Sequence, residues 1–252
     1  MEKQYLDLDK KLKKLKKLLI NHIDIFLDEL TTKEGNLVRE LAKISDLQAH
    51  MQKFFNEHGI EYLAYMVKVV DKVLNKAVEN FEEDGAEYKD VAYMKDLLGI
   101  KGDKVAKKRN GQYTVLWALA SMVVIEQDIM NRLQAAFMTE TRARDFKEAV
   151  RNSVSRKYHD FFEVNTLAVL FNTYNASNYH FAKKYEYNKF RYEGGLIADS
   201  RDFCVERDGQ EFWIYQGKEW NNLEWRGKIP GVDFFVQAGG YNCRHWIVFI
   251  KV

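Results

Sequence analysis

The chain contains 252 residues, of which 46% are hydrophobic and 30% are charged, and its formal net charge is +2. That length suits one large domain or two small ones, and so small a net charge gives no global field that would attract nucleic acid. No stretch approaches the roughly 20 apolar residues of a membrane-spanning helix, and two cysteines are too few for a disulfide framework, so neither a membrane contact nor a disulfide-stabilised fold is expected.

Residues 1–160 are predicted to form a helical region. Glycine is sparse and proline is absent there, and apolar residues recur at helical spacing. The lysines near the N-terminus are not followed by the apolar run of a signal peptide, so we expect synthesis in the cytoplasm. Glycines separate the helices, which are expected over residues 8–30, 37–56, 60–82, 88–98, 113–138 and 139–158.

The first predicted helix carries a basic run with the sequence KKLKKLKK. Its six lysines are Lys10, Lys11, Lys13, Lys14, Lys16 and Lys17, and residues 101–109 form a second basic cluster. Such lysines can bind DNA phosphates, or they can form the solvated face of a helix, which is their commoner use. The sequence leaves both interpretations open.

Residues 161–252 are predicted to form a small α+β module. Eight of the 14 glycines, the only proline and four of the five tryptophans follow residue 190. The alternation in YEYNKFRY (185–192) predicts a half-buried strand. FCVERDGQEFWIY predicts a hairpin that turns at Asp208 and Gly209, and HWIVFIKV predicts a closing strand. The expected fold class is therefore α+β, with a long helical region followed by a module of short antiparallel strands.

Cysteine and histidine provide the candidate chemistry of this module. The chain has no glycine-rich phosphate loop, no G-x-S-x-G turn and no H-E-x-x-H motif. Cys204, Cys243 and His245 could supply three zinc ligands if their two segments meet. A fourth ligand would then be Asp199, Asp202, His180 or water. Two free buried thiols, without a cofactor, are the first expectation; zinc and a disulfide, which the cytoplasm disfavours, are the alternatives.

An arginine stands beside each cysteine segment, in SRDFC and NCRH. A guanidinium can join two loops by bidentate pairing with a carboxylate. We therefore expect Arg201 and Arg244 to form structural clamps with Asp199, Asp202 or Asp208.

Taken in order, these segments resemble the C-terminal domain of the MuF-like phage head morphogenesis family, also called minor head or minor capsid proteins. FRYEGGLIADSRDFC, RDGQEF and GGYNCRHWIVFI follow one another as in that family. The resemblance covers about residues 160–252. The positions that match its pattern are Arg201, Cys204, Gly209, Gly240, Asn242, Cys243, Arg244 and His245.

The resemblance implies a structural minor head protein of a tailed bacteriophage, not an enzyme. Such a protein would reside in the virion, in the head interior or near the portal, bound to the portal or the major capsid protein. It would act in head assembly or in DNA ejection, and the lysines of residues 10–17 would contact packaged double-stranded DNA. The alternative hypothesis, which uses the cysteine and histidine set, is a zinc-dependent hydrolase or a toxin-like effector.

Overall fold

The structure is a computed structural model of the chain. It describes residues 55–114, 143–158, 165–241 and 243–252, together with residues 10, 13–14, 17–18, 20–21, 24–25, 28, 49, 53, 116–117, 131 and 135. Asn242, Lys11, Lys16 and most of the helices predicted over 37–56 and 113–138 lie outside these residues.

The chain forms two compact units that interleave along the sequence. The first comprises Met1–Val67 and Lys101–Val164, and the second comprises Lys68–Ile100 and Asn165–Val252. The units thus depart from the predicted division into 1–160 and 161–252, because residues 68–100 belong with the C-terminal part. Aromatic packing is the physical reason: the ring of Phe81 lies 5.4 Å from that of Phe181 and 5.0 Å from that of Tyr187.

The first unit contains helices and short strand pairs. A π-helical turn, η1 (Phe55–Gly59), leads into α3 (Ile60–Glu79), which crosses from the first unit into the second. β1 (Ile100–Lys101) and β2 (Lys104–Val105) form one small sheet, and β3 (Lys108–Arg109) and β4 (Gln112–Tyr113) form another. In α7 (Ala143–Tyr158), Lys147 pairs with Asp28 and Arg151 pairs with Asp24.

Two predictions for this unit are corrected at β3 and β4. Tyr113 lies in a strand and not at the start of a helix, because Asn110 and Gly111, with φ of 50° and 81°, turn the chain back on itself. Positive φ at both positions is typical of a type I′ hairpin. The basic cluster of residues 101–109 consequently lies on short strands and turns, not on a helix.

The helix predicted over residues 88–98 is divided in two. It consists of the 3-10 turn η3 (Tyr88–Asp90), preceded by another such turn, η2 (Glu82–Asp84), and of the short helix α4 (Tyr93–Leu97). Val91 separates the two parts with a φ of −115° and is fully buried. The free energy gained by burying the Val91 side chain exceeds the free energy that a continuous helix would gain at this position.

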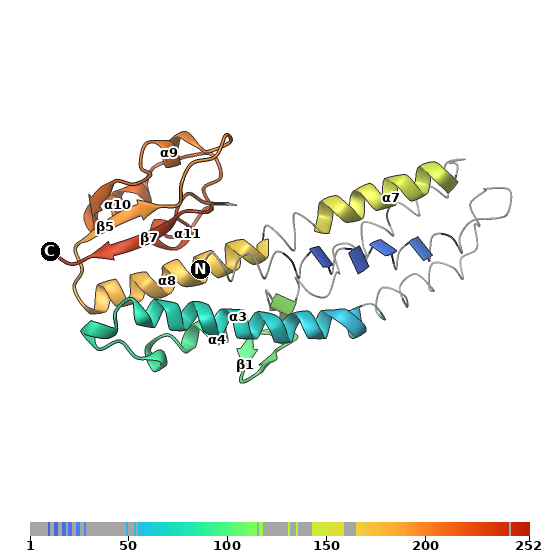
Figure 1. Cartoon of the computed structure of the whole chain (residues 1–252), viewed down its shortest axis with the longest axis horizontal. Coiled ribbons are helices and arrows are strands. Elements are labelled where there is room, and N and C mark those ends of the chain that lie inside the picture. The colour runs from blue at the N-terminus through green and yellow to red at the C-terminus, as the bar shows by residue number, and fades with distance from the viewer. Residues whose placement is uncertain are drawn as a thin grey trace. The chain divides into compact units, whose positions relative to one another are not determined.

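Helix α8 (Asn165–Lys184) is the middle layer of the second unit (Figure 1). On one side it packs against residues 68–100, where Asn80 Nδ2 donates hydrogen bonds of 2.8 Å to Tyr174 Oη and Asn178 Oδ1. On the other side it packs against the sheet and against α11 (Phe234–Gln237). Buried asparagines of α8 make hydrogen bonds on both sides. Asn178 faces residues 68–100, and Asn175 Oδ1 accepts from the N–H of Ile247 in β7 at 3.3 Å.

The sheet has three antiparallel strands in the order β6-β5-β7. β5 (Lys189–Glu193) is central, between β6 (Glu211–Trp213) and β7 (Trp246–Ile250). Alternate residues of a strand face the same side, so Phe190 and Tyr192 both enter the core. Around them lie the buried residues Tyr179, Phe203, Cys204, Trp220, Phe234, Phe235, Ala238 and Ile247.

The closing strand is confirmed as β7, whereas the two other strand predictions need correction. The strand predicted over 185–192 begins only at Lys189, because α8 ends in a Schellman-type turn with Glu186 at φ 60° and Tyr187 N–H bonded to Ala182 O. The first arm of the predicted hairpin is the short helix α9 (Asp202–Val205), and β6 pairs with β5 instead. After β6 the chain continues directly into α10 (Ile214–Trp220).

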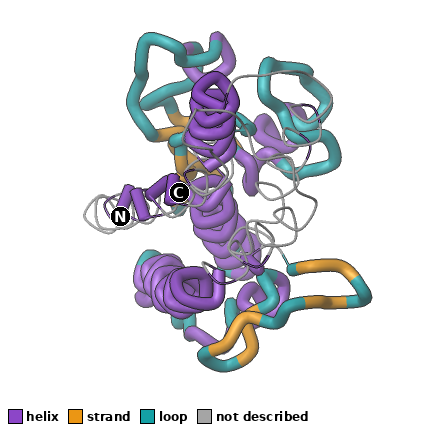
Figure 2. The backbone as a smooth tube through the Cα atoms, turned by 90° about the vertical axis from the view of Figure 1, so that its right-hand side faces the viewer, coloured by secondary structure: helices purple, strands orange, loops and turns teal. Residues whose placement is uncertain are grey.

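The fold is α+β, as expected, with helices and short antiparallel strands; the strands, orange in Figure 2, are short beside the purple helices. None of the helices in the described part of the chain combines the length and the apolar composition needed to cross a membrane.

Candidate functional site

Two loops of the second unit meet beside the sheet and bring three reactive side chains together. Cys204 comes from α9, and Cys243 and His245 immediately precede β7. One sulfur or nitrogen atom from each residue lies within 4.8 Å of the others. We call these residues the sulfur–imidazole cluster. The two segments therefore meet, as the zinc and disulfide hypotheses both required, and both cysteines are free thiols.

Cys243 accepts hydrogen bonds at the centre of this cluster. The backbone N–H groups of Gly239 and His245 point at its sulfur, at 3.2 and 3.4 Å, and His245 Nδ1 lies 3.5 Å from it. A hydrogen bond with Cys204 and, after it, those from His245 hold the pKa of Cys243 well below its usual range, despite burial. The same hydrogen bond raises the pKa of Cys204. Of the two sulfurs, Cys243 is therefore the one whose surroundings favour the thiolate form.

Tyr192 lies against both sulfurs and against the imidazole. Its hydroxyl oxygen is 3.4 Å from Cys204 Sγ and 3.6 Å from Cys243 Sγ, and its ring stacks on His245 with centroids 4.5 Å apart. The side chain is fully buried, and burial raises the pKa of its phenol well above the usual value. The phenol thus stays protonated and can donate a hydrogen bond to a sulfur.

Asp208 faces the outer nitrogen of the imidazole. Its Oδ1 lies 3.1 Å from His245 Nε2 and also accepts the N–H of Gly195 at 3.1 Å. The approach is close enough for an ion pair with a protonated ring, but it is poorly directed, so the buried Nε2 has no hydrogen bond. Asp208, predicted as a partner for arginine, is therefore a partner of histidine.

Glycines allow the close approach of these segments. A Cβ atom at Gly239 would lie 2.6 Å from both sulfurs and 2.8 Å from Tyr192 Oη. At Gly240, which has a φ of 91°, a Cβ would lie 2.1 Å from the carbonyl oxygen of Gly227. Side chains at these two positions would separate the loops, so glycine is required sterically at both.

The predicted clamp between arginine and aspartate is wrong for Arg201. Its guanidinium donates to backbone carbonyls, to Gly239 O at 3.3 Å and to Tyr241 O. Trp225 Nε1 donates to the same Gly239 oxygen at 3.0 Å. The guanidinium binds backbone carbonyls and not a carboxylate because the 239–241 turn presents its carbonyl groups towards α9. Arg244 is exposed and has no partner within the described part of the chain.

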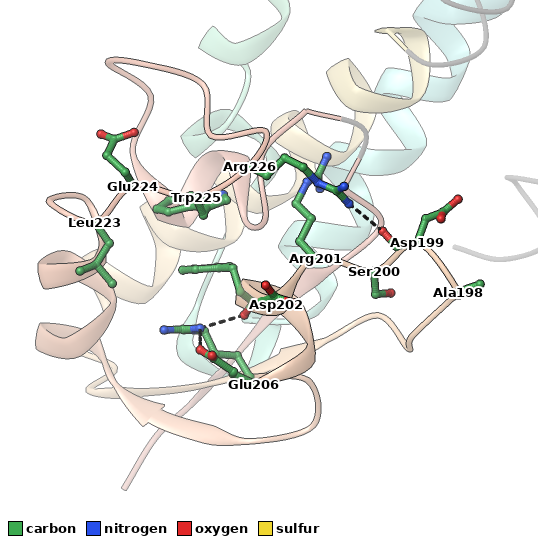
Figure 3. A pocket seen from close by; sticks show the side chains of 12 residues that line it. Ala198, Asp199, Ser200, Arg201, Asp202, Glu206, Leu223, Glu224, Trp225 and Arg226 are labelled. Atoms are coloured by element: carbon green, nitrogen blue, oxygen red, sulfur yellow. Dashed lines mark hydrogen bonds and ion pairs between the residues drawn. The ribbon is translucent and has the colours of Figure 1, made fainter.

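A polar hollow of about 630 Å³ lies on the outer side of Arg201 (Figure 3). Its walls are formed by residues 198–203, 206–207 and 223–226, which include three arginines and four acidic residues. Arg226 donates to the carbonyl of Asp199 at 3.3 Å, and Arg207 pairs with Glu206 at 2.8 Å. Charges of both signs thus line an open hollow, and an ion pair joins two of these lining residues, Arg207 and Glu206.

The remaining predicted residues occupy different surroundings. Gly209, with a φ of 74°, turns the chain after α9 towards β6. The proposed fourth ligands Asp199 and Asp202 are exposed. The third, His180 on α8, packs against Tyr93 of α4 and against its neighbour Phe181. None of the three side chains joins the cluster. Of the six lysines, those described are helical and exposed: Lys10, Lys13, Lys14 and Lys17.

Tyr192 and Asp208 are the cluster neighbours that the sequence interpretation missed. The alternation that placed Phe190 on the buried face also placed Tyr192 there, so a signal existed. No pattern in the sequence predicts the contact between Asp208 and His245. That contact depends on the turn at Gly209, which positions the end of α9 beside β5. Comparison of the chain with protein-family models, with curated proteins and with solved structures gave no match.

Proposed function

We propose that the chain is a structural minor head protein of a tailed bacteriophage, whose C-terminal part is a rigid unit for docking to the portal or the capsid. One observation supports this proposal above others. Arg201, from the first matching stretch, contacts the turn around Gly240 in the second stretch. Cys204, also from the first stretch, lies together with Cys243 and His245 from the second. The pattern on which the resemblance rests therefore corresponds to one three-dimensional unit.

The second unit also exposes apolar side chains that suit a docking role. Trp213 and Tyr215, at the junction of β6 and α10, are 40% and 59% exposed. Aromatic residues are enriched where proteins bind one another. A rigid aromatic core under such residues lowers the entropy lost on binding, which favours a stable contact.

Contact with packaged DNA stays a prediction. Lys10, Lys14 and Lys17 are helical and exposed, and residues three and four apart lie on one helical face. A helical face of this kind can neutralise phosphates, and binding would then weaken steeply with salt. Affinity of the purified chain for double-stranded DNA that is independent of salt would contradict it.

The decisive experiment identifies the chain in particles. Cells that carry the gene are induced, particles are purified on a density gradient, and their peptides are identified by mass spectrometry. We expect peptides of this chain at low copy number relative to the major capsid protein, and their loss when the gene carries an early stop codon. Particles that contain portal and capsid proteins without this chain would overturn the proposal, as would neighbouring genes that encode neither protein.

A matched pair of variants locates the docking surface in the same particles. Trp213→Ser combined with Tyr215→Ser is expected to lower incorporation of the chain several-fold, since truncation of central aromatic residues at an interface removes much of the binding energy. Val205→Ser, which alters another exposed apolar residue of the unit, serves as the control and should be incorporated normally.

A further inference from the structure

We propose that Cys204, Cys243 and His245 bind one zinc ion, which locks the two loops of the second unit together. This site is independent of the phage assignment, since it depends only on the chemistry and the geometry of the cluster. Two thiolates and an imidazole are a common ligand set of zinc.

The spacing of the ligand atoms fits zinc. In a tetrahedral site with bonds of about 2.3 Å to sulfur and about 2.0 Å to nitrogen, the ligand atoms lie roughly 3.5 to 3.8 Å apart. Cys243 Sγ and His245 Nδ1 are already 3.5 Å apart, and all three ligand atoms lie within 4.8 Å of one another. Small side-chain rotations therefore complete the site.

Gly239 lets the backbone lie close to both sulfurs. A Cβ at this position would lie 2.6 Å from Cys204 Sγ and 2.6 Å from Cys243 Sγ. Any side chain here would therefore push the two cysteines out of place. Glycine at 239 thus keeps both thiols close enough to His245 to share one ion.

The surroundings of the ligands are those of a metal centre. Two backbone N–H groups, from Gly239 and His245, donate to Cys243 Sγ and would support a thiolate. A histidine that binds a metal through one nitrogen usually directs its other N–H at a carboxylate. Asp208 Oδ1 lies 3.1 Å from Nε2 in a ring that is 4% exposed, but the approach is poorly directed and Nε2 has no hydrogen bond. We expect the small rotation that brings Nδ1 onto the zinc ion to direct the Nε2–H at Asp208, which would satisfy this buried atom.

The fourth corner favours a structural site over a catalytic one. Tyr192 Oη lies 3.4 and 3.6 Å from the two sulfurs, the separation expected between corners of the same tetrahedron. A catalytic zinc site keeps one position open to water. Here the buried phenol occupies that side, so we assign the ion to stabilisation of the 239–245 loop and not to hydrolysis.

Elemental analysis and native mass spectrometry of the full chain test the proposal. The chain is produced in medium supplemented with zinc and purified under reducing conditions. We expect about one zinc ion per chain, as for a single structural site, and release of that zinc by a strong chelator. Cobalt(II) added afterwards should give the intense visible bands of tetrahedral coordination together with a charge-transfer band from thiolate.

Variants assign the ligands. Cys204→Ser, Cys243→Ser and His245→Gln should each lose the ion, whereas His180→Gln, which alters a histidine outside the cluster, should retain it. Asp208→Asn should weaken zinc binding by about 10- to 100-fold, the usual effect of removing an outer carboxylate. The matched control is Asp202→Asn, an exposed carboxylate of α9, which should leave the affinity unchanged.

Three results would overturn the proposal. The first is the absence of zinc in the reduced, folded chain, even after direct titration with zinc chloride. The second is a chain mass lower by two hydrogen atoms under reducing purification, which would indicate a disulfide. The third is equal affinity in the Asp208→Asn and Asp202→Asn variants. If the cysteine variants do not fold, the cobalt spectrum of the unaltered chain and the aspartate pair still decide the question.

Discussion

Gly209 and Gly240 both have positive φ, yet their surroundings differ. Their φ angles are 74° and 91°, in the region that L residues rarely adopt. A Cβ at Gly209 would meet no atom within 4 Å, whereas a Cβ at Gly240 would lie 2.1 Å from the carbonyl oxygen of Gly227. Both match the pattern of the resemblance, but only Gly240 is required by contact between two loops.

This contrast gives a prediction at the scale of single residues. Gly209→Ala and Gly240→Ala share the backbone strain of positive φ, which costs roughly 1–2 kcal/mol. Gly240→Ala adds a steric conflict, and overpacking costs about 1–3 kcal/mol more. We therefore expect the free energy of unfolding in urea to fall further for Gly240→Ala. Equal losses in the two variants would show that Gly227 moves aside without cost.

Asp84 connects three segments of the second unit at the scale of elements. It lies in η2, accepts a hydrogen bond of 2.6 Å from Tyr187 Oη beyond α8, and pairs with Lys251 beyond β7. The hydrogen bonds from Lys251 and then Tyr187 lower the pKa of Asp84 below its ordinary value of 3.8. The carboxylate thus ties residues 68–100 to the end of the chain.

The sign of its pH dependence follows from that lowered pKa. A carboxyl whose pKa is lower in the folded state stabilises the fold above the unfolded pKa, and this contribution is lost as pH falls through the folded value. We expect Asp84→Asn to reduce stability at pH near 7, and the difference from the unaltered chain to shrink below a pH of about 4. Urea unfolding at both pH values measures this. Glu82→Gln, an exposed neighbour, should show no such pattern, and a deficit that persists in acid would contradict the assignment to charge.

The two units set the organisation of the whole molecule. Residues 68–100 lie far in sequence from residues 165–252, yet Phe81 is 3% exposed and packs against Phe181 and Tyr187. Asn80 adds hydrogen bonds to Tyr174 and Asn178. The stability of the C-terminal part should therefore depend on a segment that composition assigned to the other domain.

Phe81→Ala tests that dependence. Loss of a buried phenylalanine costs about 3–5 kcal/mol, and four of the five tryptophans follow residue 190. We expect the tryptophan fluorescence transition in urea to move to lower denaturant in this variant. Leu97→Ala, at a position that is 57% exposed, is the control and should leave the transition in place. An unchanged transition in Phe81→Ala would instead support folding units at 1–160 and 161–252.

Local patterns in the sequence determined the fold class, the helices α3 and α7 within a few residues, the strand β7, and the cysteine and histidine side chains of the cluster. Period and composition carry such information because they report which face of an element is buried. Only the tertiary structure decided the rest: Val91 divides a predicted helix, α9 replaces a strand, Arg201 binds carbonyls, and Asp208 faces His245. These outcomes depend on which distant groups meet when the core closes, and the free energy of those contacts exceeds the local preferences that the sequence displays.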